Sequence, residues 1–468
     1  MDSRNIIFIM LDTVRADMLK PYGGSINVKN IGRLSNYGIK YNAAIAPGTY
    51  TLPSHLSIFL GKRVRSIPWL QFMGIRYSER MTDPFLRKSR YVAGRKELTI
   101  AQVMEYFGYR SALFSNNPFV SDATGLAAGF SHISNLFIEN KLRTNKTSVK
   151  AVLGLIQSSY ARRSLVRLAG HVSGLVPSTR LDEMYISLRK RLNAHFSKEY
   201  GYYDLDKGAA ETNSRLESYI RYNNHPSNFI FINYMEGHEG YPTNLFTDRY
   251  VEQDKWLHMT GMASEEDLEV TRKAYSKRIE YLDTKVGQAI GMMRGKGMLD
   301  NATIIVSSDH GQAFMEHGTM FHNVHPHNEV IRVPLIMAYF RNGRQVREKV
   351  EIDKPFSLTE LSNLITGRKQ QHGNVVVSDH TGITEVWDTQ LLRLLKKRSR
   401  NAETVYRKKV QQDMHSTAIF HGRYKLIHYY GNRKDELYRI DADPGESFNI
   451  IDKNRSVAHS LLEYGTAA

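Results

Sequence analysis

The chain has 468 residues, 41% of them hydrophobic, so it can form one large domain with a smaller one, or two to three domains. It contains no cysteine, which excludes disulfides and thiolate metal sites. The net charge is +17, and such a surface attracts anions, leaving nucleic acid, an anionic membrane, a polyanionic glycan and plain solubility all open.

The sequence contains no uncharged apolar run of about 18 residues, so no transmembrane helix is expected. The first apolar run, 6–11, is short and lacks the small-residue cleavage site of a signal peptide. We therefore expect a cytoplasmic protein.

Strand-like apolar runs alternate with helical patterns along the chain. The runs are 5–11, 109–114, 229–235, 302–306 and 333–339, and the helical patterns include 99–107 and 267–293. This alternation predicts an α/β fold with a parallel sheet flanked by helices. Ligands of such sheets bind at the carboxyl ends of strands, and these ends carry Asp12, Glu236, His238, Asp309 and His310.

Two other regions differ from this pattern. The stretch 139–199 is helical in pattern and carries 12 Lys and Arg against four Asp and Glu. Near the end, 417–420 and 423–429 flank His421-Gly422 as a hairpin, and 436–440 can add a third strand. We expect an α/β catalytic domain over 1–355, with a basic helical insertion at about 138–200. A C-terminal subdomain with a small antiparallel sheet should follow over 356–468.

Parts of the basic regions have amphipathic spacing. In 150–176, apolar residues recur at roughly helical intervals beside arginines, and 391–400 is similar. Such helices can lie on an anionic membrane, which makes peripheral membrane contact one hypothesis. The other is a lid helix packed on the core.

The segment 46–61 holds the best candidate for a nucleophile. Thr51 suits an N-cap, Pro53 the first turn and Gly61 the stop of a short helix. Free backbone N–H groups at a helix start favour an anion, and His55 lies one turn further on the same face. A hydroxyl beside a metal ion can lose its proton and attack phosphorus or sulfur. Alone, the segment is equally a simple capped helix.

Together with other segments, it resembles the sulfatase family of the alkaline-phosphatase superfamily. The similar segments are collinear and cover nearly the whole chain except about 130–200: Ile6–Asp12, Thr51-Leu-Pro-Ser-His55, Leu98–Ala112, Asn233–Pro242, Ser307–Gly311, Glu316-His-Gly318, Ile331–Pro334, Tyr424–Ile427 and Glu436–Glu446. The resemblance implies an alkaline-phosphatase-like core sheet and a metal-dependent hydrolase or transferase acting on a phosphate or sulfate ester.

The resemblance also implies roles for individual residues. Asp12, Asp309 and His310, with the Thr51 hydroxyl, would hold a divalent metal ion (Ca, Mg, Mn or Zn), because a cation offsets the charge of an anionic ester. His238 and His322 would act as general acids or contact the anion. The remaining candidates are His55 in the place of the family arginine, and His317, Asn116 and Asn117 for substrate binding.

The chain departs from the family at three points. Sulfatases convert Cys or Ser to formylglycine, which Thr51 cannot form. Thr13 stands where the family has a second aspartate, and Ser115–Pro118 replaces a Gly-Lys-x-His that grips sulfate. These changes resemble the Thr-nucleophile branch, which transfers phosphoryl-linked groups.

We therefore expect an ester hydrolase or phosphotransferase with Thr51 as its nucleophile and an anionic substrate, glycan- or lipid-linked among the candidates. The alternative is a catalytically weakened relative that binds an anionic glycan or lipid. Nucleic acid is not expected as a partner, because no recognition motif accompanies the charge.

Overall fold

The computed structural model describes residues 5–63, 98–121, 125–136, 205–239, 265–322, 325–367, 375–381, 415–431 and 433–467. The predicted basic insertion at 138–200 and the two amphipathic segments, 150–176 and 391–400, lie outside these residues. Among the described helices, none has the length and apolar character to cross a membrane.

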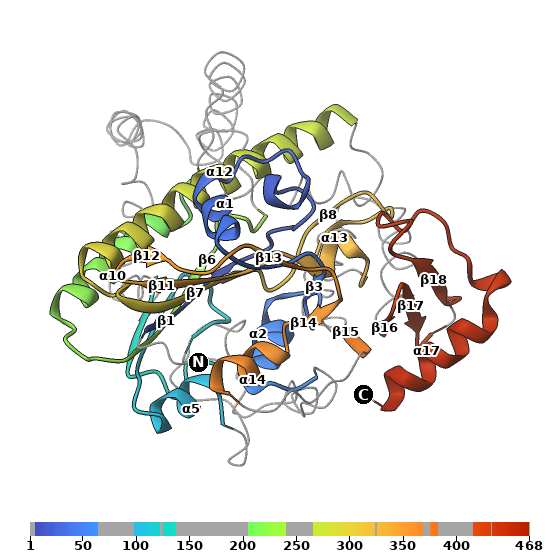
Figure 1. Cartoon of the computed structure of the whole chain (residues 1–468). Helices are drawn as coiled ribbons and strands as arrows, with labels where there is room; N and C mark the ends of the chain where they lie inside the picture. Colours follow the sequence, from blue (N-terminus) through green and yellow to red (C-terminus); the bar gives the residue numbers. More distant parts are fainter. Residues whose placement is uncertain are drawn as a thin grey trace, which may run out of the picture.

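A mixed nine-stranded sheet forms the centre of the described fold (Figure 1). Its order is β13-β2-β11-β7-β1-β6-β4-β5, and β12 pairs with β11. The strands are β1 (Asn5–Leu11), β2 (Gly38–Tyr41), β4 (Arg110–Ser115), β5 (His132–Asn135), β6 (Asn228–Tyr234), β7 (Asn301–Ser307), β11 (Leu335–Arg341), β12 (Arg344–Gln345) and β13 (Val350–Ile352).

The inner strands are parallel and buried. β1 pairs in parallel with β6 on one side and β7 on the other, and all seven of its residues are buried. A continuous apolar run suits a strand that is covered on both faces. β11 joins β7 antiparallel, so the sheet is mixed and not purely parallel as its alternating pattern predicted.

Helices cover both faces of the sheet (Figure 1). On one face lie α1 (Lys29–Asn36), α10 (Ala209–Tyr222) and α12 (Glu265–Gly295); on the other lie α2 (Thr51–Leu60), α5 (Ile100–Tyr106) and α14 (Glu360–Thr366). Each layer encloses its own hydrophobic core against the sheet. Thr99 caps α5 through a capping box with Gln102.

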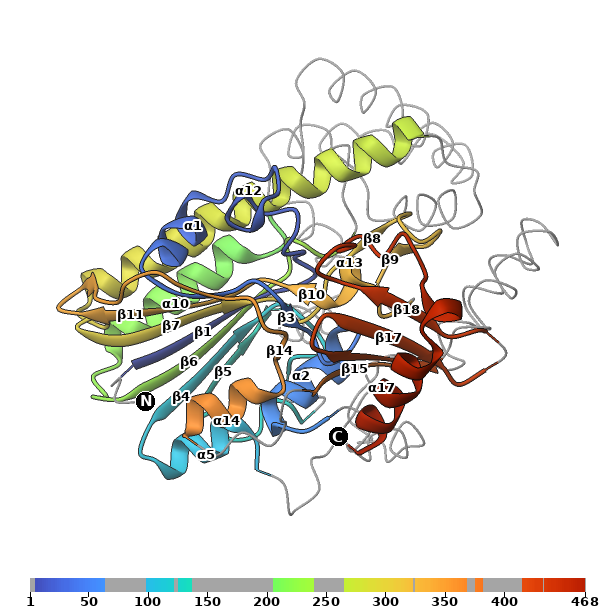
Figure 2. The same cartoon turned by 45° about the vertical axis from the view of Figure 1, so that its right-hand side comes forward.

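A second sheet lies beside the first, with order β15-β16-β17-β18 and all pairs antiparallel (Figure 2). Its strands are β15 (Val375–Thr381), β16 (His415–His421), β17 (Tyr424–Tyr429) and β18 (Glu436–Arg439), and α17 (Arg455–Ala467) packs on it. The predicted hairpin is confirmed, and Gly422 turns it with φ 60°. β15 was not predicted.

The remaining described elements are short. They are η1 (Lys20–Tyr22), β3 (Ala44–Ile45), β8 (Ala313–Phe314), β9 (Met320–Phe321), α13 (Asn328–Ile331), β10 (Arg332–Val333), β14 (Phe356–Ser357) and η5 (Ile451–Lys453). The predicted domain boundary near residue 356 stays a prediction. Beyond that residue, β14 pairs with β3 and α14 packs on α2.

Candidate functional site

Helix α2 places Thr51 at the edge where the central strands end. Tyr50 is its N-cap, with extended backbone, so Thr51 is the first helical residue and not the cap that was predicted. Gly61 ends the helix in the left-handed conformation, as predicted. The side chain of His55 turns back along the helix, and its Nδ1 lies 2.9 Å from the Thr51 carbonyl oxygen.

Asp12, Asp309 and His310 meet in front of Thr51. Asp12 follows β1 and the other two follow β7, so two neighbouring parallel strands bring them together. His310 Nε2 lies 3.4 Å from Thr51 Oγ1, 3.5 Å from Asp309 Oδ2 and 3.9 Å from Asp12 Oδ1. All four side chains are buried.

The donor set of this group fits a divalent cation. Asp12 Oδ1 and Asp309 Oδ2 are buried and have no hydrogen-bond partner among the described residues, although such oxygens are normally satisfied. Burial raises the pKa of Asp12 well above its ordinary value, and the charge of Asp309 adds to this shift. Burial likewise raises the pKa of Asp309 to about 7. A bound cation would offset the free-energy cost of burying two negative charges. Two carboxylates, a hydroxyl and an imidazole are ligands that such ions accept.

Burial favours the neutral form of the His55 and His310 rings. Burial lowers the pKa of His55 to about 4. It also lowers the pKa of His310 well below the ordinary value, and His322 contributes to that shift. Neutral His310 keeps a nitrogen lone pair for a metal ion.

Backbone and amide groups hold the carboxylates in place. Asp309 Oδ1 accepts the backbone N–H groups of His310 at 3.0 Å and Thr13 at 3.3 Å, and Thr13 has φ 60°. Asp12 Oδ2 accepts Asn117 Nδ2 at 2.7 Å. Each carboxylate thus has one oxygen tied to the protein and one oxygen left for another partner.

A second polar group adjoins the first. Glu239 Oε2 lies 3.2 Å from His238 Nδ1 and 3.1 Å from His322 Nδ1. The rings of His322 and His310 are 4.5 Å apart between centroids, which places the second group beside the first. These three residues, like Asp12, Asp309 and His310, form a set able to hold a metal ion. The predicted residues His238 and His322 are therefore near neighbours of Thr51's site.

Glu239 and Lys207 belong to this group but were not among the predicted site residues. Half-buried Lys207 donates through Nζ to the carbonyl oxygens of His238, at 2.7 Å, and of Glu239. The strand-end rule could have found Glu239, since it directly follows His238 after β6. Lys207 precedes α10 at a distance in sequence from every motif, so only the fold brings it here.

Other predicted substrate contacts lie on protein partners. Asn117 holds Asp12 and, through Oδ1, the N–H of Phe119 at 2.9 Å. The Asn116 amide donates to the Lys207 carbonyl oxygen. Both nitrogens of His317 face acceptors in a separate cluster, Glu329 at 2.6 Å and the Glu446 carbonyl at 3.2 Å. Substrate contact by these residues stays a prediction that their placement does not favour.

The chain belongs to the sulfatase family, whose model, described as Sulfatase, matches residues 4–367. Solved structures share the fold. A phosphonate monoester hydrolase of Agrobacterium radiobacter is similar at TM-score 0.60 and 14% identity, over 99% of this chain and 95% of that one. A 2-O GAG sulfatase is similar at TM-score 0.60 and 13% identity, over 100% and 91%. These likenesses confirm the predicted alkaline-phosphatase-like architecture.

Sequence relatives point to the same family. The choline-sulfatase of Rhizobium meliloti (strain 1021) is 29% identical over 196 residues, 41% of this chain and 35% of that protein. The arylsulfatase of Chlamydomonas reinhardtii is 23% identical over 255 residues, 47% of this chain and 38% of that protein. The matched regions therefore span little more than a third of these relatives.

Proposed function

We propose that this protein cleaves or transfers an anionic ester, with a phosphoester preferred over a sulfate ester, through Thr51 as its nucleophile. One observation carries the proposal: the Thr51 hydroxyl stands at a helix start 3.4 Å from His310 Nε2, beside two buried carboxylates that each leave one oxygen without a hydrogen bond. That arrangement suits a hydroxyl poised beside a cation.

The proposed ligands of the cation are Asp12, Asp309, His310 and the Thr51 hydroxyl. A bound divalent cation supplies charge neutralisation and lowers the pKa of a nearby hydroxyl. The ion's identity stays open among Ca, Mg, Mn and Zn. The start of α2 adds free backbone N–H groups and a favourable dipole for the anion.

The proposed reaction assigns separate roles to Thr51 and to the two histidines of the adjoining group. Thr51 Oγ1 loses its proton to water and forms a bond to the phosphorus or sulfur atom, while the bond to the leaving oxygen breaks. His238 or His322 gives that oxygen a proton, because both rings lie beside the first group. Water or an acceptor hydroxyl later attacks the same centre and releases Thr51, which completes hydrolysis or transfer.

The threonine supports a phosphoester. Oxidation of a threonine side chain at Cβ cannot yield an aldehyde, so we expect no formylglycine at position 51. A phosphoryl group can be carried on an ordinary hydroxyl. Phosphorus also tolerates a diester, whose lower charge suits a site where Ser115–Pro118 offers no lysine or histidine.

A substrate panel tests this function. Aryl phosphate, bis-aryl phosphate, aryl phosphonate monoester and aryl sulfate are assayed with Mg²⁺, Mn²⁺, Ca²⁺ and Zn²⁺, using wild type, Thr51→Ala and Thr51→Ser. We expect Thr51→Ala to lose about 10³-fold or more in kcat on the preferred ester, and Thr51→Ser to retain part of it. Thr284→Ala, on the exposed side of α12, is the matched control.

Two results would overturn the proposal. Full activity of Thr51→Ala on every ester that wild type cleaves would rule out Thr51 as the nucleophile. Wild type inert on the whole panel with every metal would favour the alternative, a binding relative. Intact-mass analysis of quenched reactions gives a direct readout, because a covalent ester adduct should appear on wild type and be absent from Thr51→Ala.

A further inference from the structure

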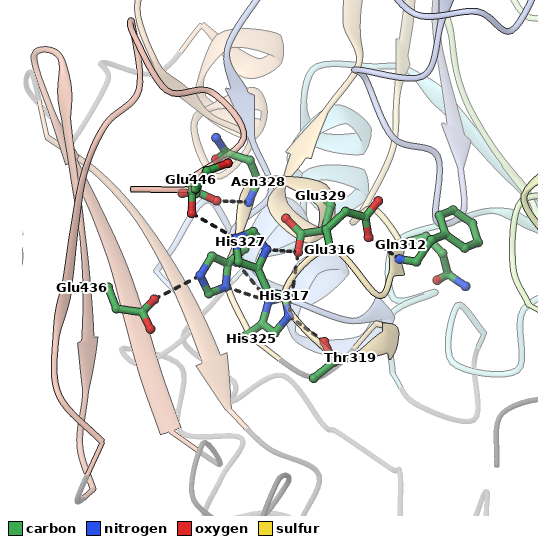
Figure 3. A network of polar contacts seen from close by, with 12 residues as sticks. Gln312, Glu316, His317, Thr319, His325, His327, Asn328, Glu329, Glu436 and Glu446 are labelled. Carbon is green, nitrogen blue, oxygen red and sulfur yellow. Dashed lines mark hydrogen bonds and ion pairs between the residues drawn. The ribbon is translucent and has the colours of Figure 1, made fainter. Parts of the chain in front are cut away.

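A second histidine group lies in the segment from the end of β8 to α13, where it faces the C-terminal sheet (Figure 3). We call it the histidine cluster, and its members are His317, His325, His327 and Glu329. One donor atom from each lies within 4.8 Å of the others. The side chains of His325 and His327 are 1% exposed and that of Glu329 is 5% exposed. None of them belongs to the groups proposed above for ester chemistry.

The outward nitrogens of these rings are held by acceptors (Figure 3). His327 Nε2 lies 3.1 Å from the Glu436 carboxylate, and His317 Nε2 lies 3.2 Å from the Glu446 carbonyl oxygen. Carboxylates and carbonyls only accept, so each of these nitrogens carries the hydrogen. The Nδ1 atoms of both rings point into the cluster, where that of His317 faces the Glu329 carboxylate and that of His327 faces His325.

The inner nitrogens face other polar atoms of the cluster at short distances. His327 Nδ1 lies 2.9 Å from His325 Nδ1, which also faces the backbone N–H of His327 at 3.4 Å. His325 Nε2 is 2.6 Å from Thr319 Oγ1, which can accept its hydrogen. His317 Nδ1 lies 2.6 Å from Glu329 Oε1, an acceptor. Protons held between these atoms satisfy the contacts, and one cation among them would take the place of those protons.

We propose that the histidine cluster binds one transition-metal ion of the zinc class. Three imidazoles and one carboxylate form an N₃O set, which suits Zn²⁺ and not Mg²⁺ or Ca²⁺, which prefer oxygen. Metal-bound histidines usually donate their other N–H to an acceptor, as His317 and His327 do here. Four protein ligands in a buried site leave no open position, which is typical of a structural metal.

The site would join the two parts of the molecule. Glu436 lies on β18, and Glu446 follows that strand. The Glu446 carboxylate also accepts the backbone N–H of Asn328 at 2.7 Å and pairs with buried Lys425. An ion held by the four members of the histidine cluster would therefore fix them against the C-terminal sheet.

The experiment separates this ion from any ion at the ester site. The parent protein carries Asp12→Asn, Asp309→Asn and Glu239→Gln, and is loaded with Zn²⁺, dialysed against a weak chelator and analysed for metal and melting temperature. We expect His325→Gln/His327→Gln in this parent to lose one zinc ion per chain and the zinc-dependent rise in melting temperature. His459→Gln, an exposed histidine on α17, should retain both.

A measurement without ligand variants protects the test against misfolding. X-ray absorption of the zinc-loaded parent should show imidazole scattering from three histidines, and cobalt substitution should give the intense visible bands of a tetrahedral site. A parent that retains no zinc, or one whose bound zinc is unchanged in His325→Gln/His327→Gln, would overturn the proposal in favour of a proton-linked cluster. Neither outcome depends on ester cleavage, so this inference and the proposed function fail separately.

Discussion

The side-chain amide of Asn117 donates a hydrogen bond of 2.7 Å to Asp12 Oδ2, and both residues are buried. The bond ties down one oxygen of the carboxylate, so that the other, Oδ1, faces His310 at 3.9 Å. Asn117 is thus placed to orient a proposed metal ligand.

Removing this amide should weaken metal binding. We expect Asn117→Ala to raise the metal concentration needed for half-maximal ester cleavage by about 10- to 100-fold, the usual cost of losing such a partner. Asn116→Ala is the matched control, because its amide bonds the Lys207 carbonyl and not Asp12. Equal metal requirements for Asn117→Ala and wild type would contradict the role, and isothermal titration with Mn²⁺ measures the affinity directly.

Gly237 packs against the site's backbone. A Cβ there would lie 2.4 Å from the Asp12 carbonyl oxygen, so Gly237→Ala should shift β1's end or the 236–239 turn. We expect a destabilisation of about 1–3 kcal/mol and a loss in kcat/KM of about 10²-fold. Gly291→Ala in α12, where a Cβ meets nothing within 4 Å, should leave activity intact and slightly raise the melting temperature. Full activity in Gly237→Ala would show that the turn adapts.

Glu236 makes stability depend on pH. Burial raises its pKa to about 7, and Oε1 accepts the N–H groups of Lys207 and Ala209 while Oε2 has no hydrogen-bond partner among the described residues. The folded-state pKa exceeds the unfolded value, so the folded protein keeps the proton longer. Ionisation therefore costs stability as pH rises from the unfolded pKa to about 7, by at most about 3 kcal/mol.

Glu236→Gln should remove this penalty, since its Oε1 can still accept both N–H groups. We expect its melting temperature to exceed that of wild type at pH 8.5, with the difference shrinking by pH 5. Glu217→Gln removes the same charge from an exposed position on α10 and serves as control. A wild-type-like melting temperature for Glu236→Gln at both pH values would refute the assignment.

Lys425 and Glu446 form a fully buried ion pair between β17 and the segment after β18. Lys425 Nζ also donates to Asn328 Oδ1 at 3.1 Å. Lys425→Met leaves the Glu446 carboxylate buried without its cation, and should destabilise the protein by about 3–5 kcal/mol. Lys425→Met/Glu446→Gln should recover much of that loss, because no unpaired charge remains. Urea unfolding of the single and double variants measures the interaction between Lys425 and Glu446. An equal loss in the free energy of unfolding in both variants would argue against that interaction.

The sequence by itself predicted much of the fold. Long apolar runs such as 5–11 and 229–235 correspond to β1 and β6, and the hairpin around Gly422 forms as expected. The sequence also determined the meeting of Asp12 with Asp309 and His310, because residues that follow neighbouring parallel strands must share one sheet edge. Capping signals placed Thr51 at the start of a helix, and the family resemblance implied its role as nucleophile.

Only the tertiary structure decided how side chains pair across that edge. Local patterns carry no information on whether β11 runs parallel to β7, or on which acceptor an amide reaches. Asn117 therefore holds Asp12, Glu239 joins His238 to His322, and His317 turns away toward Glu329 and Glu446, because packing between distant segments sets each side chain's direction.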